Sequence, residues 1–173
     1  AGPTFYAGIV ATKAYLWGTN VVGSIGDNTT INKSSPVLLG NQFINTGTII
    51  PTRINFGANS WTAVSAGQSY SLAIRNDNTL WAWGLNTLGQ LGDNTVVGKS
   101  VFTLVSSSYW SMVAAGRSVG MAYRSTGASA GIFAWGYNGA GGVGDATTTN
   151  RSSPVQVASQ YAAGQYFSPF LVT

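Results

Sequence analysis

Three chemically important residue types are missing from this chain of 173 residues, which contains no histidine, no glutamate and no cysteine. The absence of cysteine removes disulfides, thiolate nucleophiles and zinc–thiolate sites. The absence of histidine removes the commonest general base and metal ligand. Only four acidic residues remain, all aspartates, and none has the nearby second acid that paired-carboxylate hydrolysis needs. We therefore expect a protein that is not an enzyme and that uses no cofactor.

Charge is scarce as well, since only 7% of the residues are charged, against roughly a quarter in an average soluble protein. The net charge of +4 comes from basic residues that are scattered singly, whereas nucleic-acid binding needs a concentrated basic face. Nucleic acid is therefore not an expected partner. No apolar run approaches the roughly 20 residues of a membrane span. A surface of Asn, Thr, Ser and Gly favours a location on a virion, outside the cell or at its surface.

A thirteen-residue phrase occurs three times, at Trp17–Thr29, Trp83–Thr95 and Trp135–Thr147. A second phrase, Trp-x-x-Val-x-Ala-Gly, occurs at Trp61–Gly67 and Trp110–Gly116, with a shortened form at Tyr161–Gly164. Repetition at a period of tens of residues predicts units that bury their apolar faces against one another. Short alternating strands and frequent turn signals predict about four strands per unit, which is the blade of an all-β propeller.

The Ala-Gly pairs divide the single repeat domain 1–173 into units of about 1–66, 67–115 and 116–163, with an extra strand at 164–173. About three blades plus a strand make an incomplete ring, because closed propellers have at least four blades. The exposed blade faces and strand edges need cover. We expect the missing blades to come from more of the same chain, from a second copy or from a larger assembly. The opening Ala-Gly-Pro indicates a processed start or a piece of a longer chain.

The first unit is longer than the others because of an insertion within 38–60. Its candidate contacts with a partner are Phe43, Ile49, Ile50, Arg53 and Phe56. Insertions in repeat proteins map to loops on one face, often the binding face. The alternative is a hairpin that covers an open blade edge. The sequence leaves both interpretations open.

Six residues recur in register and are interpreted as structural: Trp17, Trp83, Trp135, Asp27, Asp93 and Asp145. The tryptophans are expected to pack between blades, with each indole N–H finding a partner, rather than to form a sugar-stacking platform. Each aspartate precedes a threonine by two positions, so its carboxylate is expected to accept backbone N–H groups and hold a turn. One carboxylate per site is a poor calcium cage, and no metal site is predicted.

Together the phrases Trp-Gly-x-Asn-x-x-Gly-x-x-Gly-Asp and x-Val-x-Ala-Gly resemble the regulator of chromosome condensation repeat, in its bacterial or phage-type β-propeller form. The resemblance covers nearly all of the chain apart from the insertion. It implies a β-propeller, usually of seven blades when closed. It also implies binding to another macromolecule through a face or rim of the propeller.

Two functions from different classes remain. The first is a non-catalytic structural or interaction protein, part of a virion (phage tail or capsid-associated) or of a cell-surface assembly, whose partners are proteins, including copies of itself. The alternative is a soluble recognition module within a longer chain, either a lectin-like glycan binder or a protein inhibitor.

Overall fold

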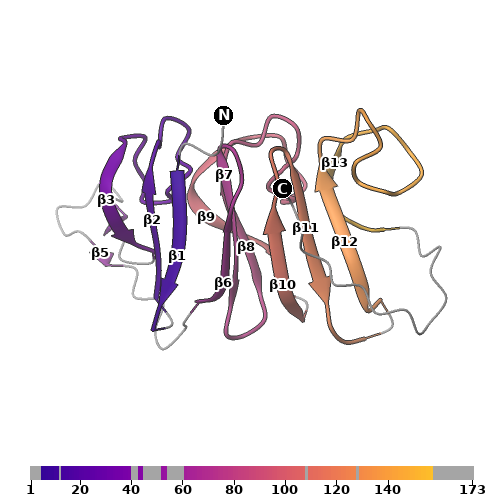
Figure 1. Ribbon diagram of the computed structural model, residues 1–173, viewed down its shortest axis with the longest axis horizontal. Coiled ribbons are helices and arrows are strands. Elements are labelled where there is room, and N and C mark those ends of the chain that lie inside the picture. Colours follow the sequence, from indigo (N-terminus) through magenta and orange to yellow (C-terminus); the bar gives the residue numbers. More distant parts are fainter. Residues whose placement is uncertain are drawn as a thin grey trace.

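The computed structural model describes residues 5–11, 13–39, 61–107, 109–127 and 129–157, together with the backbone of 43–44 and 52–53. This part of the chain contains thirteen β-strands and no helix, and hence no helix that could cross a membrane. Three antiparallel sheets stand in a row in chain order, with the first and third at opposite ends (Figure 1). The predicted all-β propeller arrangement, an incomplete ring, is confirmed.

Each sheet is one blade, and its strands follow one another as a meander. Blade 1 contains β1 (Phe5–Val10), β2 (Lys13–Gly18) and β3 (Lys33–Leu38). Blade 2 contains β6 (Trp61–Ala66), β7 (Tyr70–Arg75), β8 (Leu80–Gly84) and β9 (Lys99–Ser106). Blade 3 contains β10 (Trp110–Ala115), β11 (Val119–Arg124), β12 (Gly131–Gly136) and β13 (Arg151–Gln156). Among the described residues, blade 1 has no counterpart of β6 and β10.

The sheets begin one strand earlier than the units counted from the Ala-Gly pairs. Strand β6 ends the counted unit 1–66, yet it pairs with β7, with Ala66 opposite Ser71. The turn between them is closed by the N–H of Gly67, which donates to the carbonyl of Tyr70 at 2.9 Å. A sheet therefore takes its first strand from one counted unit and the other three from the next. The proposed extra strand at 164–173 lies outside the described residues.

Strand β7 is buried along its whole length because a blade lies on each of its faces. Tyr70, Leu72 and Ile74 face blade 3, and Ala73 faces blade 1. This burial on both faces explains why four of the six residues of β7 are apolar. The edge strands β3 and β13 each contain a proline, Pro36 or Pro154, which cannot donate a backbone hydrogen bond to a further strand.

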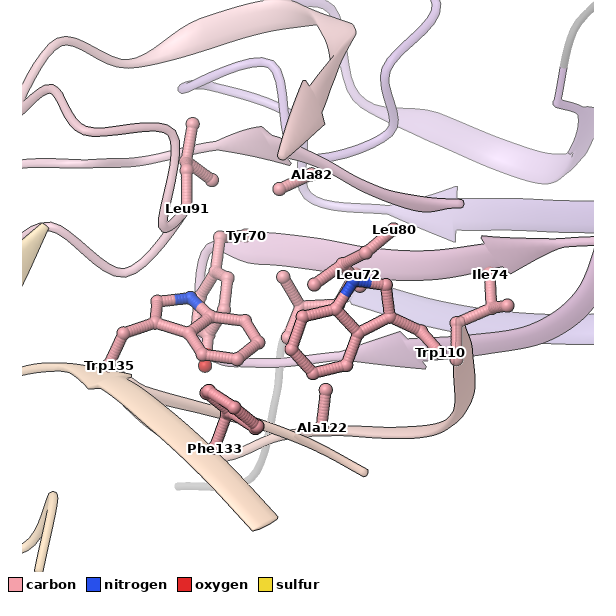
Figure 2. Packing of buried hydrophobic residues seen from close by; sticks show 10 residues of the cluster. All are labelled: Tyr70, Leu72, Ile74, Leu80, Ala82, Leu91, Trp110, Ala122, Phe133 and Trp135. Atoms are coloured by element: carbon pink, nitrogen blue, oxygen red, sulfur yellow. The ribbon is translucent and has the colours of Figure 1, made fainter. Parts of the chain in front are cut away.

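The apolar cores lie at the two junctions between blades. The first junction buries Phe5, Ala14, Leu16, Ile25, Leu39, Trp61, Ala73, Trp83 and Phe102. The second buries Tyr70, Leu72, Ile74, Leu80, Ala82, Leu91, Trp110, Ala122, Phe133 and Trp135 (Figure 2). Equivalent repeat positions fill both junctions, as with Trp61 and Trp110. Because each cluster needs side chains from two blades, the stability of each blade depends on its neighbours.

Candidate interaction surface

The three thirteen-residue phrases form the long loops that join the last two strands of each blade, at 19–32, 85–98 and 137–150. All three lie on one side of the row of blades, the upper side in Figure 1. We call the surface made by these three loops the loop face.

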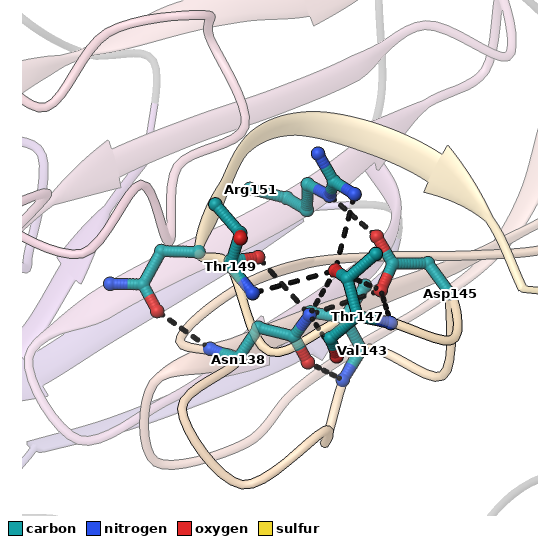
Figure 3. Close-up of polar contacts among 7 residues, drawn as sticks. Asn138, Val143, Asp145, Thr147, Thr149 and Arg151 are labelled. Atoms are coloured by element: carbon teal, nitrogen blue, oxygen red, sulfur yellow. Dashed lines mark hydrogen bonds and ion pairs between the residues drawn. The ribbon is translucent and has the colours of Figure 1, made fainter.

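A fully buried asparagine braces each loop: Asn20, Asn86 or Asn138. In blade 3 the side-chain oxygen of Asn138 accepts the N–H of Val143 at 2.9 Å (Figure 3). Its amide nitrogen donates to the carboxylate of Asp145 and to the carbonyl of Thr147, both at 3.0 Å. It also contacts the carbonyl of Thr149 at 3.1 Å. One buried amide thus holds four points of the loop, and the other two loops repeat this pattern.

The repeated aspartates lie inside the same loops and accept hydrogen bonds locally. One carboxylate oxygen of Asp145 accepts the N–H of Thr147 at 3.1 Å and its hydroxyl at 2.8 Å. The other oxygen pairs with Arg151. The matching pairs are Asp27 with Lys33 at 3.0 Å and Asp93 with Lys99 at 3.8 Å. Each acid is therefore neutralised by a base of its own blade.

These contacts lower the pKa of the carboxyl groups of Asp145 and Asp27. The hydrogen bond from the Thr147 hydroxyl, helped by that from Arg151, lowers the pKa of Asp145 from its usual 3.8 to about 2. Burial alone would raise the pKa of Asp27, but hydrogen bonds from Thr29 and Lys33 outweigh it and hold that pKa below its usual value. Both groups therefore stay ionised in the folded chain at mildly acidic pH.

We expect the fold to lose stability as the pH falls from about 4 towards 2. A carboxyl group whose pKa is lower in the folded state stabilises that state above the unfolded pKa, and this contribution disappears as the pH falls through the folded pKa. The variant Asp145→Asn cannot lose a charge, so its melting temperature should fall less steeply over this range than that of the wild type. Thermal unfolding followed by circular dichroism measures both slopes, and equal slopes would contradict the assignment.

The loop face also carries large apolar side chains in water. The exposed fractions are 64% for Val21, 67% for Ile31, 60% for Val96, 61% for Val97 and 43% for Tyr137. Single exposed apolar residues are ordinary, but several on one side of a protein mark an interaction surface. Because the aspartates of these loops are paired with bases, this face is locally neutral in charge, and it presents its apolar side chains among exposed asparagines and threonines.

Of the repeated tryptophans, Trp83 and Trp135 lie at the two junctions, as predicted, whereas Trp17 belongs to neither junction. Trp83 and Trp135 are fully buried. The indole nitrogen of Trp83 donates to the carbonyl of Ser24 at 2.7 Å, and that of Trp135 donates to the carbonyl of Gln90 at 2.9 Å. Both acceptors belong to the preceding blade. Trp17, in blade 1, is only half-buried and stacks on Tyr6, with the ring centroids 5.8 Å apart.

Part of the insertion forms a separate two-stranded ladder of β4 (Phe43–Ile44) and β5 (Thr52–Arg53). Phe43 lies opposite Arg53 in its register. Within the described residues these strands pair only with each other and not with blade 1. The candidates Ile49, Ile50 and Phe56 lie outside the described residues. That the insertion contacts a partner, or that it covers an open blade edge, both remain predictions.

Neither the three brace asparagines nor the exposed valines of the loops were predicted from the sequence. The asparagines had one signal, since an asparagine stands three positions after the tryptophan in every copy of the phrase. No sequence signal marked Val96 and Val97, because a valine stands at neither position in the other two repeats and both residues are typical of strands.

Antiparallel meander blades, packed face to face through a repeated tryptophan, define a β-propeller-type repeat protein. The pattern described as the regulator of chromosome condensation (RCC1) repeat matches residues 61–90 and again residues 77–123. Residues 61–123 of the chain therefore match this repeat.

Known proteins with similar sequences or folds are much longer than this chain. Ultraviolet-B receptor UVR8 of Arabidopsis thaliana is 26% identical over 147 residues, which cover 83% of this chain and 29% of that protein. Human WBSCR16 superposes with a TM-score of 0.69 at 18% identity, over 89% of this chain and 35% of its own. Prp20p of Saccharomyces cerevisiae gives a TM-score of 0.69 at 20% identity, over 91% and 37%. The structural matches show a shared fold.

Proposed function

We propose that the chain is a non-catalytic protein-interaction module whose partner binds the loop face. The observation that carries this proposal is the exposure of Val21, Ile31, Val96 and Val97, each at 60% or more. The buried asparagines hold these loops in place before any partner arrives. Pre-ordered loops lose little conformational entropy on binding, which favours affinity.

A structural relative supports a protein as the partner. Yeast RCC1 (Prp20), which matches this chain with a TM-score of 0.68, has been solved bound to Kap60. The same yeast protein has been studied for its binding to Gsp1p and histones. This fold is used elsewhere to bind proteins, and the loop face is locally neutral with exposed apolar side chains. Both observations favour a protein ligand over nucleic acid.

As its setting we propose a virion, either a phage tail or a capsid, or a cell-surface assembly. The low charged content of 7% supports a surface or particle protein. Assembly is supported by the two ends of the row, which no further blade covers among the residues that the structure describes. Mass spectrometry and immunogold labelling of purified particles from the source should find the chain on the particle surface. Its absence from particles and from the cell surface would contradict this setting.

Site-specific photo-crosslinking tests the loop face. With a photoreactive phenylalanine analogue at Val97, irradiation in an extract of the producing cells should give one adduct of discrete mass. The matched control is Thr126, which is also exposed but lies in the β11–β12 connection on the opposite side of the row (Figure 1). Adducts of equal yield at both positions, or none at Val97, would contradict the proposal. Glycan-array binding without an adduct would favour the lectin-like alternative.

A further inference from the structure

Every acidic residue of the chain is paired with a base of its own. Three of these pairs involve the aspartates of the long loops. The fourth joins Asp77 to Arg75 in blade 2, with the atoms Oδ2 and Nη2 3.9 Å apart. Eight bases against four acids leave four bases without an acid, and these account for the net charge of +4. They are Lys13, Arg53, Arg117 and Arg124.

Arg117 lies on the same side of the row of blades as the loop face. It is exposed and stands in the short turn between β10 and β11, on the upper side in Figure 1. The next residue, Ser118, accepts the N–H of Tyr137 at its carbonyl at 2.9 Å. Because Tyr137 is one of the exposed apolar residues of the loop face, the turn of Arg117 directly adjoins that face.

The other bases without an acid lie elsewhere. Lys13 begins β2 and Arg124 ends β11, so both stand at the ends of their strands that are remote from the long loops. The side chain of Arg53 lies outside the described residues. Within the part of the chain that the structure describes, Arg117 is therefore the one base on the loop side that has no acid.

A hydrogen bond to the neighbouring blade fixes the direction of the Arg117 side chain. Its Nε donates to the side-chain oxygen of Gln68 at 3.0 Å, and Gln68 holds the same position after Ala-Gly in blade 2. No other hydrogen bond or ion pair joins the guanidinium to a described residue. Because Nε is already used, the two Nη atoms are the donors that Arg117 presents to a ligand.

The turn that carries Arg117 packs tightly against the matching turn of blade 2. A Cβ at Gly67 would meet the carbonyl oxygen of Gly116 at 2.6 Å, so a side chain there would force the two turns apart. Beside this contact, the N–H of Ala115 donates to the hydroxyl of Ser65 at 2.9 Å. The backbone of Arg117 is therefore held in place before a ligand arrives, which lowers the entropy lost on binding.

We propose that the protein bound by the loop face places a carboxylate, from an aspartate or glutamate side chain, on the two Nη atoms of Arg117. This inference rests on the proposed function and names the chemistry of its partner. The planar fork of an arginine matches the two oxygens of a carboxylate in a bidentate pair. The loop aspartates do not compete for Arg117, because each is already paired. The partner surface thus combines apolar side chains with an acid.

Photo-crosslinking from Val97, repeated in the variants Arg117→Gln and Lys13→Gln, tests the role of Arg117. Each variant removes one exposed base that has no acid, but Lys13 lies on the side opposite the loop face. The yield of the protein adduct should fall about ten-fold or more in Arg117→Gln and stay unchanged in Lys13→Gln. Equal yields in the two variants would overturn this inference and leave the proposed function standing. No adduct from Val97 in the wild type would overturn both.

Charge reversal provides a test that misfolding cannot mimic. Calorimetric titration of the crosslinked partner should show binding to Arg117→Glu that is at least about ten-fold weaker than to the wild type, because like charges then meet. Arg117→Lys keeps the charge but loses the fork, so an intermediate affinity is expected. Changing the contacting acid of the partner to lysine should restore binding to Arg117→Glu. If no acid on the crosslinked surface of the partner gives this rescue, the inference is wrong.

Discussion

Replacing Asn86 with alanine should lower the free energy of unfolding by about 3 kcal/mol, because several groups inside the β8–β9 loop lose their partner together. The amide of Asn86 donates to the carboxylate of Asp93 and to the carbonyl of Thr95, both at 3.0 Å. Its oxygen accepts the N–H of Leu91 at 2.9 Å. Leu91 is part of the second junction, so the loss should extend from the loop to the contact between blades.

Urea unfolding of the variant and the wild type measures this effect. Thr87→Ala is the matched control, since Thr87 is the exposed neighbour of Asn86 in the same loop, and it should change the unfolding free energy by less than about 0.5 kcal/mol. Asn86→Asp keeps the shape but replaces the donating amide with a second carboxylate beside Asp93, so it should be destabilising too. A loss below about 1 kcal/mol in Asn86→Ala would show that the amide is not the brace.

The fold class was predictable because a triplicated phrase reveals repeat architecture before any strand is assigned. The strand at which each sheet begins was not predictable, because a periodic sequence can be divided into units at any point of its period. Only the hydrogen bonds of the hairpin show that Trp61 to Ala66 belongs with the strand after it. Strand β6 contacts both neighbouring blades. This explains why the phrase Trp-x-x-Val-x-Ala-Gly is conspicuous in the sequence although it does not mark the boundary of a sheet.

The candidate surface was less predictable than the fold. Asparagine is usually a turn or surface residue, so nothing local distinguishes Asn86 as a buried brace. Its partners lie between five and eleven positions away, and only the folded loop brings them together. Val96 and Val97 could not be identified as exposed, because β-branched residues are typical of strands and no periodicity separates these two from the strand that follows.

The junctions between blades hold most of the apolar core, so the second large effect is expected there. Removing the indole of Trp135 should lower the free energy of unfolding by about 3–5 kcal/mol, the usual range for deleting a large buried aromatic side chain. Its ring belongs to the cluster of the second junction, and its N–H donates to Gln90 in the preceding blade. Trp135→Phe keeps an aromatic ring but removes that donor, so an intermediate loss is expected.

Trp17 is the internal control, because it has the same repeat position but no preceding blade among the residues that the structure describes. The most direct measurement is therefore a pair of urea unfolding curves for Trp135→Ala and Trp17→Ala, each compared with the wild type. If the junctions stabilise the fold, Trp135→Ala should lose about 3–5 kcal/mol and Trp17→Ala no more than about 1 kcal/mol. Equal losses at the two positions would show that these tryptophans stabilise single blades and not the contacts between them.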